Sequence, residues 1–218
     1  MFDTVTVIGA GRAGSAIAAR LRERGVRVGE DGELQLLCVP DRAIAEVARS
    51  VPLGPWVAHV SGATPLAELA PHVRRFSVHP LQTLTRSRGP EQLEGAWSAV
   101  TGETPEALSH AQALATTLGL RPFTLADDRR ALYHAGAAMA SNFLVTLHRG
   151  AAQLMADAGA PPEALVPLME RTIANGFELT GPIARGDTET VDRHLVAIRA
   201  DEPGLEPLYA ALAEATRP

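Results

Sequence analysis

Three glycines near the start of the chain have the spacing of a phosphate-binding turn. Gly9, Gly11 and Gly14 form a G-x-G-x-x-G pattern directly after the apolar run Val5–Ile8. In such a turn the first glycine makes the tight bend, the second lets the backbone approach a pyrophosphate, and the third lets the next helix pack closely on the strand. The helix N-terminus then faces the anion. We therefore expect a dinucleotide site here; the alternative is a glycine turn that only packs a helix on a sheet.

Further candidates for cofactor contacts lie inside and after this turn. Arg12 stands within the glycine pattern, where its guanidinium can meet a phosphate. Glu30 follows at about the 20-residue spacing at which such folds place an acid for the ribose hydroxyls. Asp41 follows the apolar run Leu34–Val39, at the expected carboxyl end of a strand. The expected cofactor is NAD or NADP, and the segment around Glu30 is the one that chooses between them.

Two polar side chains that could do chemistry come at the ends of later strands. Ser61 follows the predicted strand Trp56–Val60, and His79 follows Arg75–Val78. Ligands of open α/β sheets bind beyond the carboxyl ends of the strands. Pro80 restricts His79 to an extended backbone, and a histidine has an ordinary pKa suited to acid–base work near neutrality. His79 is the predicted general base; a satisfied structural histidine is the alternative.

The C-terminal part of the chain carries two more candidates. Asn142 lies within an apolar helical pattern, where its amide needs a partner, either a ligand or another helix. Arg185 could clamp a carboxylate or a phosphate, and the nearby Asp187 fits a helix N-cap. No Cys, His or Asp cluster has the spacing of metal ligands, so no metal is expected.

The composition excludes several classes of function. All 20 basic residues are arginines, so a Schiff-base lysine and a P-loop lysine are ruled out. A net charge of -5 without a basic stripe argues against nucleic acid or a membrane surface as the main partner. No apolar run approaches a membrane span, and the first residues do not resemble a signal peptide. Cys38, the only cysteine, lies in an apolar run, so we expect an inert buried thiol in a cytoplasmic protein.

The elements that must position these residues alternate between strand and helix up to about residue 125. Such alternation is typical of a mostly parallel sheet covered on both faces. One unit of the pattern is too short. Between a possible strand at residues 26–28 and the run from Leu34, no residues remain for a crossover, which takes about a dozen residues or more. Asp31-Gly32 fits a tight hairpin turn, or the segment is a loop. Dinucleotide binding is therefore a hypothesis.

Past residue 125 the pattern is helical throughout. We expect a Rossmann-like α/β domain over residues 1–125, with the second strand and helix truncated, and an all-helical domain over residues 126–218. Asp127–Ala158 fits one long helix or a kinked pair. Such a long helix with an apolar face suggests a homodimer formed through the C-terminal helices; burial within its own domain is the alternative.

With these residues assembled, the chain resembles the Rossmann-like family that carries the domain of unknown function DUF2520, in the 6-phosphogluconate-dehydrogenase-like group of oxidoreductases. The resemblance is carried by VIGAGRAGSAIA, CVPDRAI, HVSGATPLAEL, SVHPLQTL, YHAGAAMASNFLVTL and LTGPIARGDTETVDRHL. It implies an N-terminal NAD(P)-type domain, an all-helical C-terminal domain and a dimer. The wider group uses a helix lysine four residues before an asparagine, and here Ala138 stands at that distance from Asn142. Ser61 and His79 resemble the serine and His-Pro histidine that hold the substrate hydroxyl in prephenate dehydrogenases.

The leading hypothesis is therefore an NAD(P)-dependent oxidoreductase that acts on a small hydroxy or keto acid. The glycine turn and Arg12 would surround the pyrophosphate, and His79 would take the hydroxyl proton. Ser61 and Asn142 would orient the reacting carbon, and Arg185 would hold the acid group. The alternative is a degenerate, non-catalytic dehydrogenase scaffold that binds a smaller anionic ligand or a protein partner. The truncated second strand and helix and the missing lysine favour that alternative.

Overall fold

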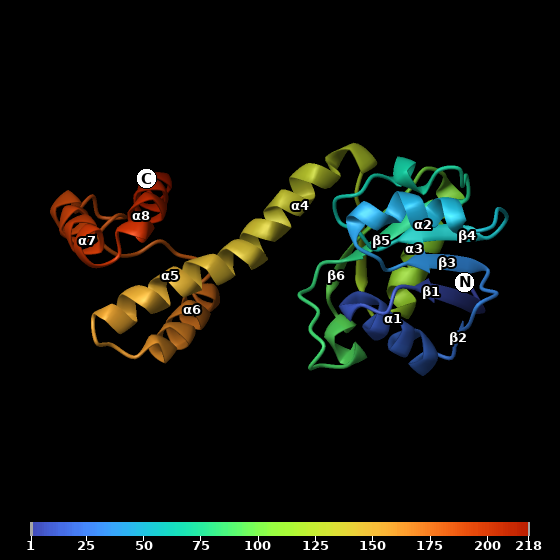
Figure 1. The fold of residues 1–218 in the computed structure, drawn as a ribbon, viewed down its shortest axis with the longest axis horizontal. Coiled ribbons are helices and arrows are strands. Elements are labelled where there is room, and N and C mark those ends of the chain that lie inside the picture. Colours follow the sequence, from blue (N-terminus) through green and yellow to red (C-terminus); the bar gives the residue numbers. More distant parts are fainter. Residues whose placement is uncertain (1, 218) are drawn as a thin grey trace. The chain divides into compact units, whose positions relative to one another are not determined.

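The chain folds into two compact units, the first ending at Met139 and the second beginning at Ala140 (Figure 1). The computed structural model describes residues 2–217. The first unit contains a seven-stranded sheet, and after the last strand the regular elements of the described chain are all helical. The predicted class, a mostly parallel α/β sheet followed by an all-helical region, is therefore confirmed.

The sheet has the strand order β2-β1-β3-β4-β5-β6-β7. All neighbouring strands pair in parallel except β5 and β6, which are antiparallel. Strands β3 and β4 are buried along their whole length, as expected for central strands covered on both faces. The strands are β1 (Thr4–Ile8), β2 (Arg27–Val28), β3 (Leu34–Leu37), β4 (Trp56–His59), β5 (Arg75–Pro80), β6 (Trp97–Gly102) and β7 (Arg121–Thr124).

Helices cover both faces of this sheet. Leu34 and Leu36 of β3 belong to one buried apolar cluster, and Leu37 belongs to another. Because successive side chains of a strand point to opposite faces, the two clusters lie on opposite sides of the sheet. The first cluster includes residues of α1 (Arg12–Glu23) and α3 (Pro105–Thr117), and the second includes residues of α2 (Ile44–Ser50).

The shortened connection between β2 and β3 is a loop that crosses β1 directly. Val5 of β1 lies opposite both Val28 of β2 and Leu34 of β3, and both pairings are parallel. The hairpin expected at Asp31-Gly32 is therefore wrong, and the loop alternative is correct. A Cβ at Gly32 would overlap the backbone nitrogen of Thr6. Residues 29–33 can replace a helical crossover because this glycine lets the loop lie against the strand.

The helical region begins with one uninterrupted run that passes from the first unit into the second. It comprises α4 (Arg130–Ala138), a π-helical turn (Met139–Phe143) and α5 (Leu144–Asp157), as the sequence pattern predicts. Helices α6 (Leu165–Ala174), α7 (Thr188–Asp201) and α8 (Glu206–Ala215) follow. Within residues 140–217, Ile198 and Ala213 are the only buried apolar side chains. The second unit therefore has almost no core of its own. No helix within residues 2–217 has both the length and the apolar character that crossing a bilayer requires.

Candidate functional site

The glycine turn after β1 has the shape that the sequence predicts. Gly9 has a φ of 115°, and a Cβ there would lie 2.5 Å from the carbonyl oxygen of Cys38. A Cβ at Gly14 would overlap the carbonyl oxygen of Gly9. These two positions therefore need glycine so that α1 can pack against the neighbouring strands. At Gly11, by contrast, no atom lies within 4 Å of the position of a Cβ. This side of the turn is open.

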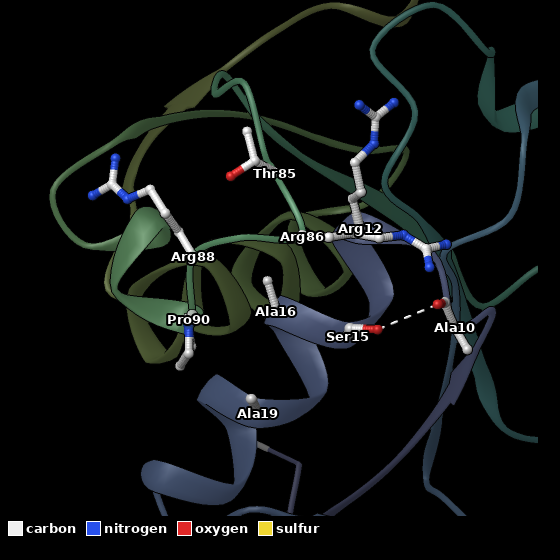
Figure 2. Close-up of a pocket in the computed structure, with 10 residues that line it drawn as sticks. Ala10, Arg12, Ser15, Ala16, Ala19, Thr85, Arg86, Arg88 and Pro90 are labelled. Atoms are coloured by element: carbon white, nitrogen blue, oxygen red, sulfur yellow. Dashed lines mark hydrogen bonds between the residues drawn. The ribbon is translucent and has the colours of Figure 1, made fainter.

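The N-terminus of α1 leaves its first N–H groups for a ligand. Gly11 is the N-cap and provides no side-chain hydrogen bond to the helix. The hydroxyl of Ser15 is turned back to the carbonyl of Ala10, at 3.3 Å (Figure 2). Unsatisfied N–H groups and the positive end of the helix dipole attract anions. An open turn with free donors fits a pyrophosphate.

A pocket of about 230 Å³ lies beside this turn (Figure 2). One wall is the first part of α1, and the other is residues 85–90, which belong to the connection between β5 and β6. Arg12 belongs to the helix, and Arg86 and Arg88 belong to the opposite wall. Figure 2 shows their guanidinium groups pointing in different directions, with that of Arg88 well apart from the other two. We call this the arginine pocket. Its remaining lining is Ala10, Ser15, Ala16, Ala19, Thr85, Gly89 and Pro90.

The residues predicted to contact the rest of a dinucleotide are exposed. Strand β2 ends opposite Val5, whereas β1 continues to Ile8. At about 3.3 Å per residue, β2 ends about 10 Å before the carboxyl end of β1. Glu30 follows this short strand, and its carbonyl accepts a hydrogen bond from the Thr6 hydroxyl at 2.9 Å. Asp41 begins a 3₁₀ turn after β3. Cofactor contacts of the Glu30 and Asp41 side chains stay predictions.

His79 lies in a cluster of aromatic polar side chains at the end of β5. Its Nδ1 is 2.7 Å from the hydroxyl of Tyr133 on α4, and its ring meets that of His134 edge-on with the centroids 6.2 Å apart. Gly62 lies against both imidazoles, because a Cβ there would be 2.8 Å from His79 Cε1 and from His134 Cδ2. The structure thus places the predicted base in a well-defined site within the first unit.

The environment of His79 keeps its imidazole neutral at physiological pH. Burial, followed by the nearby His134 and Arg130, lowers the pKa of His79 to about 4, while Asp41 acts in the opposite direction. A neutral imidazole carries one proton. If Nδ1–H donates to the Tyr133 oxygen, the lone pair of Nε2 is free to accept a proton. Tyr133 can therefore select the tautomer that acts as a base.

Ser61 joins the same site, but its side chain also organises the local turn. Its hydroxyl oxygen accepts hydrogen bonds from the backbone nitrogens of Ala63 at 3.2 Å and Thr64 at 3.0 Å. Its own N–H donates to Nδ1 of the fully buried His59 at 3.2 Å. His59 must then carry its proton on Nε2, which has no partner among the described residues. Burial, with help from Arg130, lowers the pKa of His59 to about 3.

The buried side chain of Arg130 holds the start of α4 against the strand ends. Its guanidinium donates to Asp127 Oδ1 at 2.6 Å, to the carbonyl of Ser61 at 3.2 Å and to the hydroxyl of Ser77. Both carboxylate oxygens of Asp127 accept from the Leu66 nitrogen at 3.1 Å. This network fixes the helix that carries Tyr133 relative to the strand that carries His79. Neither Arg130 nor Tyr133 has a role that the sequence alone predicts.

The other predicted site residues belong to the second unit. Asn142 lies in the π-helical turn with its side chain exposed, and no hydrogen bond of its amide occurs among the described residues. Arg185 is also exposed. Asp187 caps α7 by accepting from the Thr190 nitrogen at 3.0 Å, as its sequence position predicts. The roles of Asn142 and Arg185 stay predictions.

Other titratable side chains have simpler explanations. Cys38 is buried, and burial raises the pKa of its thiol to about 12, as expected for an inert cysteine. Nε2 of His72 is hydrogen-bonded to the carbonyl of Ala48 at 2.8 Å, and the ring of His110 stacks on that of Phe2. Within residues 2–217, no group of three or more His, Cys, Asp or Glu side chains is arranged to hold a metal ion.

Comparison with protein families gives one match. The model of the family described as "Domain of unknown function (DUF2520)" matches residues 96–216. This stretch runs from the start of β6 through the helical region. No curated protein matches the chain.

Solved structures match over nearly the whole chain. A Bacteroides fragilis protein described as a candidate NADP oxidoreductase has a TM-score of 0.83 at 22% identity, covering 98% of this chain and 97% of that one. A Thermotoga maritima protein has a TM-score of 0.77 at 20% identity, covering 97% and 96%. A semialdehyde dehydrogenase NAD-binding protein from Cupriavidus necator, solved with calcium and NAD, has a TM-score of 0.64 at 18% identity, covering 97% and 99%. The fold is therefore that of NAD(P)-binding oxidoreductases.

Proposed function

The chain belongs to the DUF2520 family, and we propose that this member is an NAD(P)-dependent oxidoreductase that acts on a small hydroxy or keto acid. One observation carries the proposal. A neutral histidine with a defined hydrogen-bond partner lies at the carboxyl end of β5, in the same unit as an open glycine turn. Ligands of open α/β sheets bind at this edge, and a neutral imidazole can act there as a base.

The cofactor contacts in this proposal involve the glycine turn. Gly9, Gly11 and Gly14 form the turn, and the N–H groups at the start of α1 would hold the pyrophosphate together with Arg12. When bound, the nicotinamide group accepts or donates the hydride. The bound cofactors of structural relatives support this choice: the Cupriavidus necator protein was solved with NAD.

His79 is the proton-transferring residue in this proposal. In the oxidation direction Nε2 takes the proton of the substrate hydroxyl, while Nδ1–H stays hydrogen-bonded to the Tyr133 oxygen. The Ser61 hydroxyl accepts two backbone N–H groups and still has its own hydrogen to donate toward a substrate oxygen.

The first experiment is a titration of the protein with NADH and NADPH, followed by nicotinamide fluorescence and by thermal shift. Micromolar affinity for either dinucleotide supports the proposal. Absence of binding at millimolar concentration contradicts it and favours the second candidate, a non-catalytic scaffold that binds a smaller anion or a protein. The short β2 and the helix-free crossover favour this second candidate, because they shorten the wall beside the adenosine half.

Replacement of His79 by Asn tests the chemistry. Asparagine keeps a polar side chain of similar size but cannot take a proton near neutral pH. We expect turnover of a responsive hydroxy acid to fall about 10²- to 10⁴-fold while the dinucleotide affinity stays unchanged. Unchanged turnover would remove His79 from the reaction. Asn142→Ala and Arg185→Ala in the same assay test the roles predicted for these two residues.

A homodimer formed through the second unit is also part of the proposal. Large apolar side chains of α5 and α6 are exposed, including Val145 at 50%, Leu168 at 61% and Ile173 at 53%. With almost no buried apolar side chains of its own, this unit needs another surface to cover it. A second copy of this chain exposes the same apolar helices and is present wherever the first copy is. Two-fold pairing is the commonest arrangement of identical chains.

A further inference from the structure

We propose that the arginine pocket binds a phosphate monoester, a terminal phosphate group with two negative charges. This group would be additional to the pyrophosphate at the glycine turn. It belongs to a phosphorylated substrate, because the 2′-phosphate of NADP is carried by the adenosine ribose, which the proposed function places beside β2 and Glu30. The binding of a phosphate in this pocket does not itself rest on the proposed function.

The wall that carries Arg86 and Arg88 is held by a buried glutamine. Nε2 of Gln92 donates to the carbonyls of Thr85 at 3.2 Å, Arg88 at 2.8 Å and Gly89 at 2.9 Å. Its Oε1 accepts from the Thr85 nitrogen at 2.8 Å. One side chain therefore fixes both ends of the segment between Thr85 and Gly89. The two arginines extend from a braced loop, which lowers the entropy cost of using them for binding.

This loop is also attached to the helix that forms the opposite wall. Arg20 of α1 donates to the carbonyl of Pro90 at 2.8 Å, and its guanidinium lies 3.3 Å from Glu94. Arg20 is buried, so the link is shielded from solvent. The distance between Arg12 on α1 and the arginines of the loop is therefore set by the fold, and the pocket does not depend on a ligand to form.

The positive charge of the pocket is not neutralised by the protein. Among the described residues, Arg12 and Arg86 form no ion pair, and Arg88 has only an exposed contact of 3.8 Å with Glu91. Glu91 Oε1 also accepts a hydrogen bond from the Gly89 nitrogen at 3.0 Å. Exposed pairs of this kind contribute little. Three arginines, none with a buried counter-ion, therefore line one pocket in a chain of net charge -5. Their guanidinium groups point in different directions in Figure 2, so a bound phosphate has to draw these exposed side chains toward it.

These features favour phosphate over other anions. Guanidinium groups form paired hydrogen bonds with phosphate oxygens, and a phosphate monoester carries about two negative charges near pH 7. A single carboxylate would leave most of the positive charge uncompensated. Apart from the arginines, the lining consists of small side chains and Pro90, with no aromatic ring on which a base could stack. The pocket therefore suits a compact, highly charged group.

The test compares the double variant Arg86→Ala/Arg88→Ala with wild type and with a control, Arg22→Ala. Arg22 lies on the same helix as Arg12, is exposed and does not line the pocket. Binding of NADPH, NADH and inorganic phosphate is measured by calorimetry, and circular dichroism checks that each variant is folded. We expect the double variant to lose about 10- to 100-fold in affinity for the ligand whose phosphate occupies the pocket, and the control to lose none.

The outcomes separate the sources of the phosphate. Weaker NADPH binding with unchanged NADH binding would place the 2′-phosphate in this pocket and overturn the assignment to a substrate phosphate. Loss of inorganic phosphate binding, with both nicotinamide cofactors unaffected, identifies a phosphate of another ligand. Equal losses of NADPH and NADH would assign the arginines to the pyrophosphate and overturn the inference. No change for any probe would overturn it as well. If no nicotinamide cofactor binds the wild type but arginine-dependent phosphate binding persists, the proposed function fails and this inference stands.

Discussion

At the scale of single residues, the proposed function needs Nδ1–H of His79 to donate to the Tyr133 hydroxyl, so that Nε2 is left as the base. The two side chains come from β5 and α4, and their polar atoms lie 2.7 Å apart. Replacing Tyr133 by Phe keeps the ring and removes only the oxygen that can hold Nδ1–H. We expect kcat in the oxidation direction to fall about 3- to 10-fold, the value of one neutral hydrogen bond, with little change in KM for the dinucleotide.

Tyr209→Phe is the matched control for this change. Tyr209 makes the same kind of contact, with His194 Nδ1 at 2.7 Å, in the second unit. Steady-state kinetics of both variants are compared with wild type. If the Tyr133 variant keeps full kcat, the hydroxyl does not select the tautomer of His79.

Two neutral histidines make stability depend on pH. The pKa of His59 is lowered to about 3 and that of His79 to about 4, from an ordinary value of 6.5. Below about pH 6.5 the unfolded chain binds protons at these positions and the folded chain does not. We expect their contribution to be complete above about pH 6.5 and to be lost progressively as the pH falls toward 4.

Urea unfolding at about pH 7.5, 6 and 5 measures this loss, and His59→Asn identifies its source. Asparagine can still accept the hydrogen bond from the Ser61 nitrogen but does not titrate. The free energy of unfolding of this variant is expected to fall less steeply with pH than that of wild type. Parallel slopes for the two proteins would show that His59 does not contribute.

At the scale of elements, Gly32 permits the crossover that replaces a helix. In Gly32→Ala the new methyl group would meet the backbone of Val5 and Thr6 and the carbonyl of Leu34, none of which can rotate away. We expect a loss of at least about 2 kcal/mol in the free energy of unfolding. Gly29→Ala is the control, because no atom lies within 4 Å of its added Cβ, and it should change stability by less than about 0.5 kcal/mol. Equal stability of the two variants would contradict the close packing of the loop.

The elements that the sequence predicts well are those whose pattern is local. The apolar strands, the glycine turn and the long helical run appear at the expected places because periodicity and turn residues act over short distances. Between β4 and β5 the alternation does not produce an α-helix. The chain forms only a 3₁₀ turn there, Leu66–Leu69, which is preceded by Pro65 and lies just before Pro71. No local pattern decides between a hairpin and a loop for residues 29–33, because the choice depends on which strands pair with β1.

The candidate site was predictable only in part for the same reason. His79 follows from the rule that ligands bind at strand ends and from the adjacent proline. Its partner Tyr133 lies 54 residues away, and Arg130 lies 53 residues from Ser77, so no local pattern links them. Arg86 and Arg88 line a pocket because Gln92 braces their loop and Arg20 attaches it to α1. Such contacts depend on tertiary packing and leave no periodic signal in the sequence.

At the scale of the whole molecule, the second unit makes the proposed homodimer testable. Light scattering after size exclusion should give the mass of two chains for wild type at micromolar concentration. Leu168→Glu places a charge on the exposed apolar surface of α6, where Leu168 is 61% exposed. Burying an unpaired carboxylate in a dimer interface costs several kcal/mol, so this variant should shift to a single chain and unfold at a lower temperature.

Val73→Glu is the control for the same substitution type in the first unit. Val73 is 88% exposed and lies outside the helices, so a charge there should leave the mass and the unfolding temperature unchanged. The comparison matters because a charge on any exposed apolar side chain can alter non-specific association. A shift for Leu168→Glu alone assigns the interface to the second unit, since only that unit lacks a core large enough to be stable by itself. A single-chain mass for wild type at every concentration would contradict the homodimer.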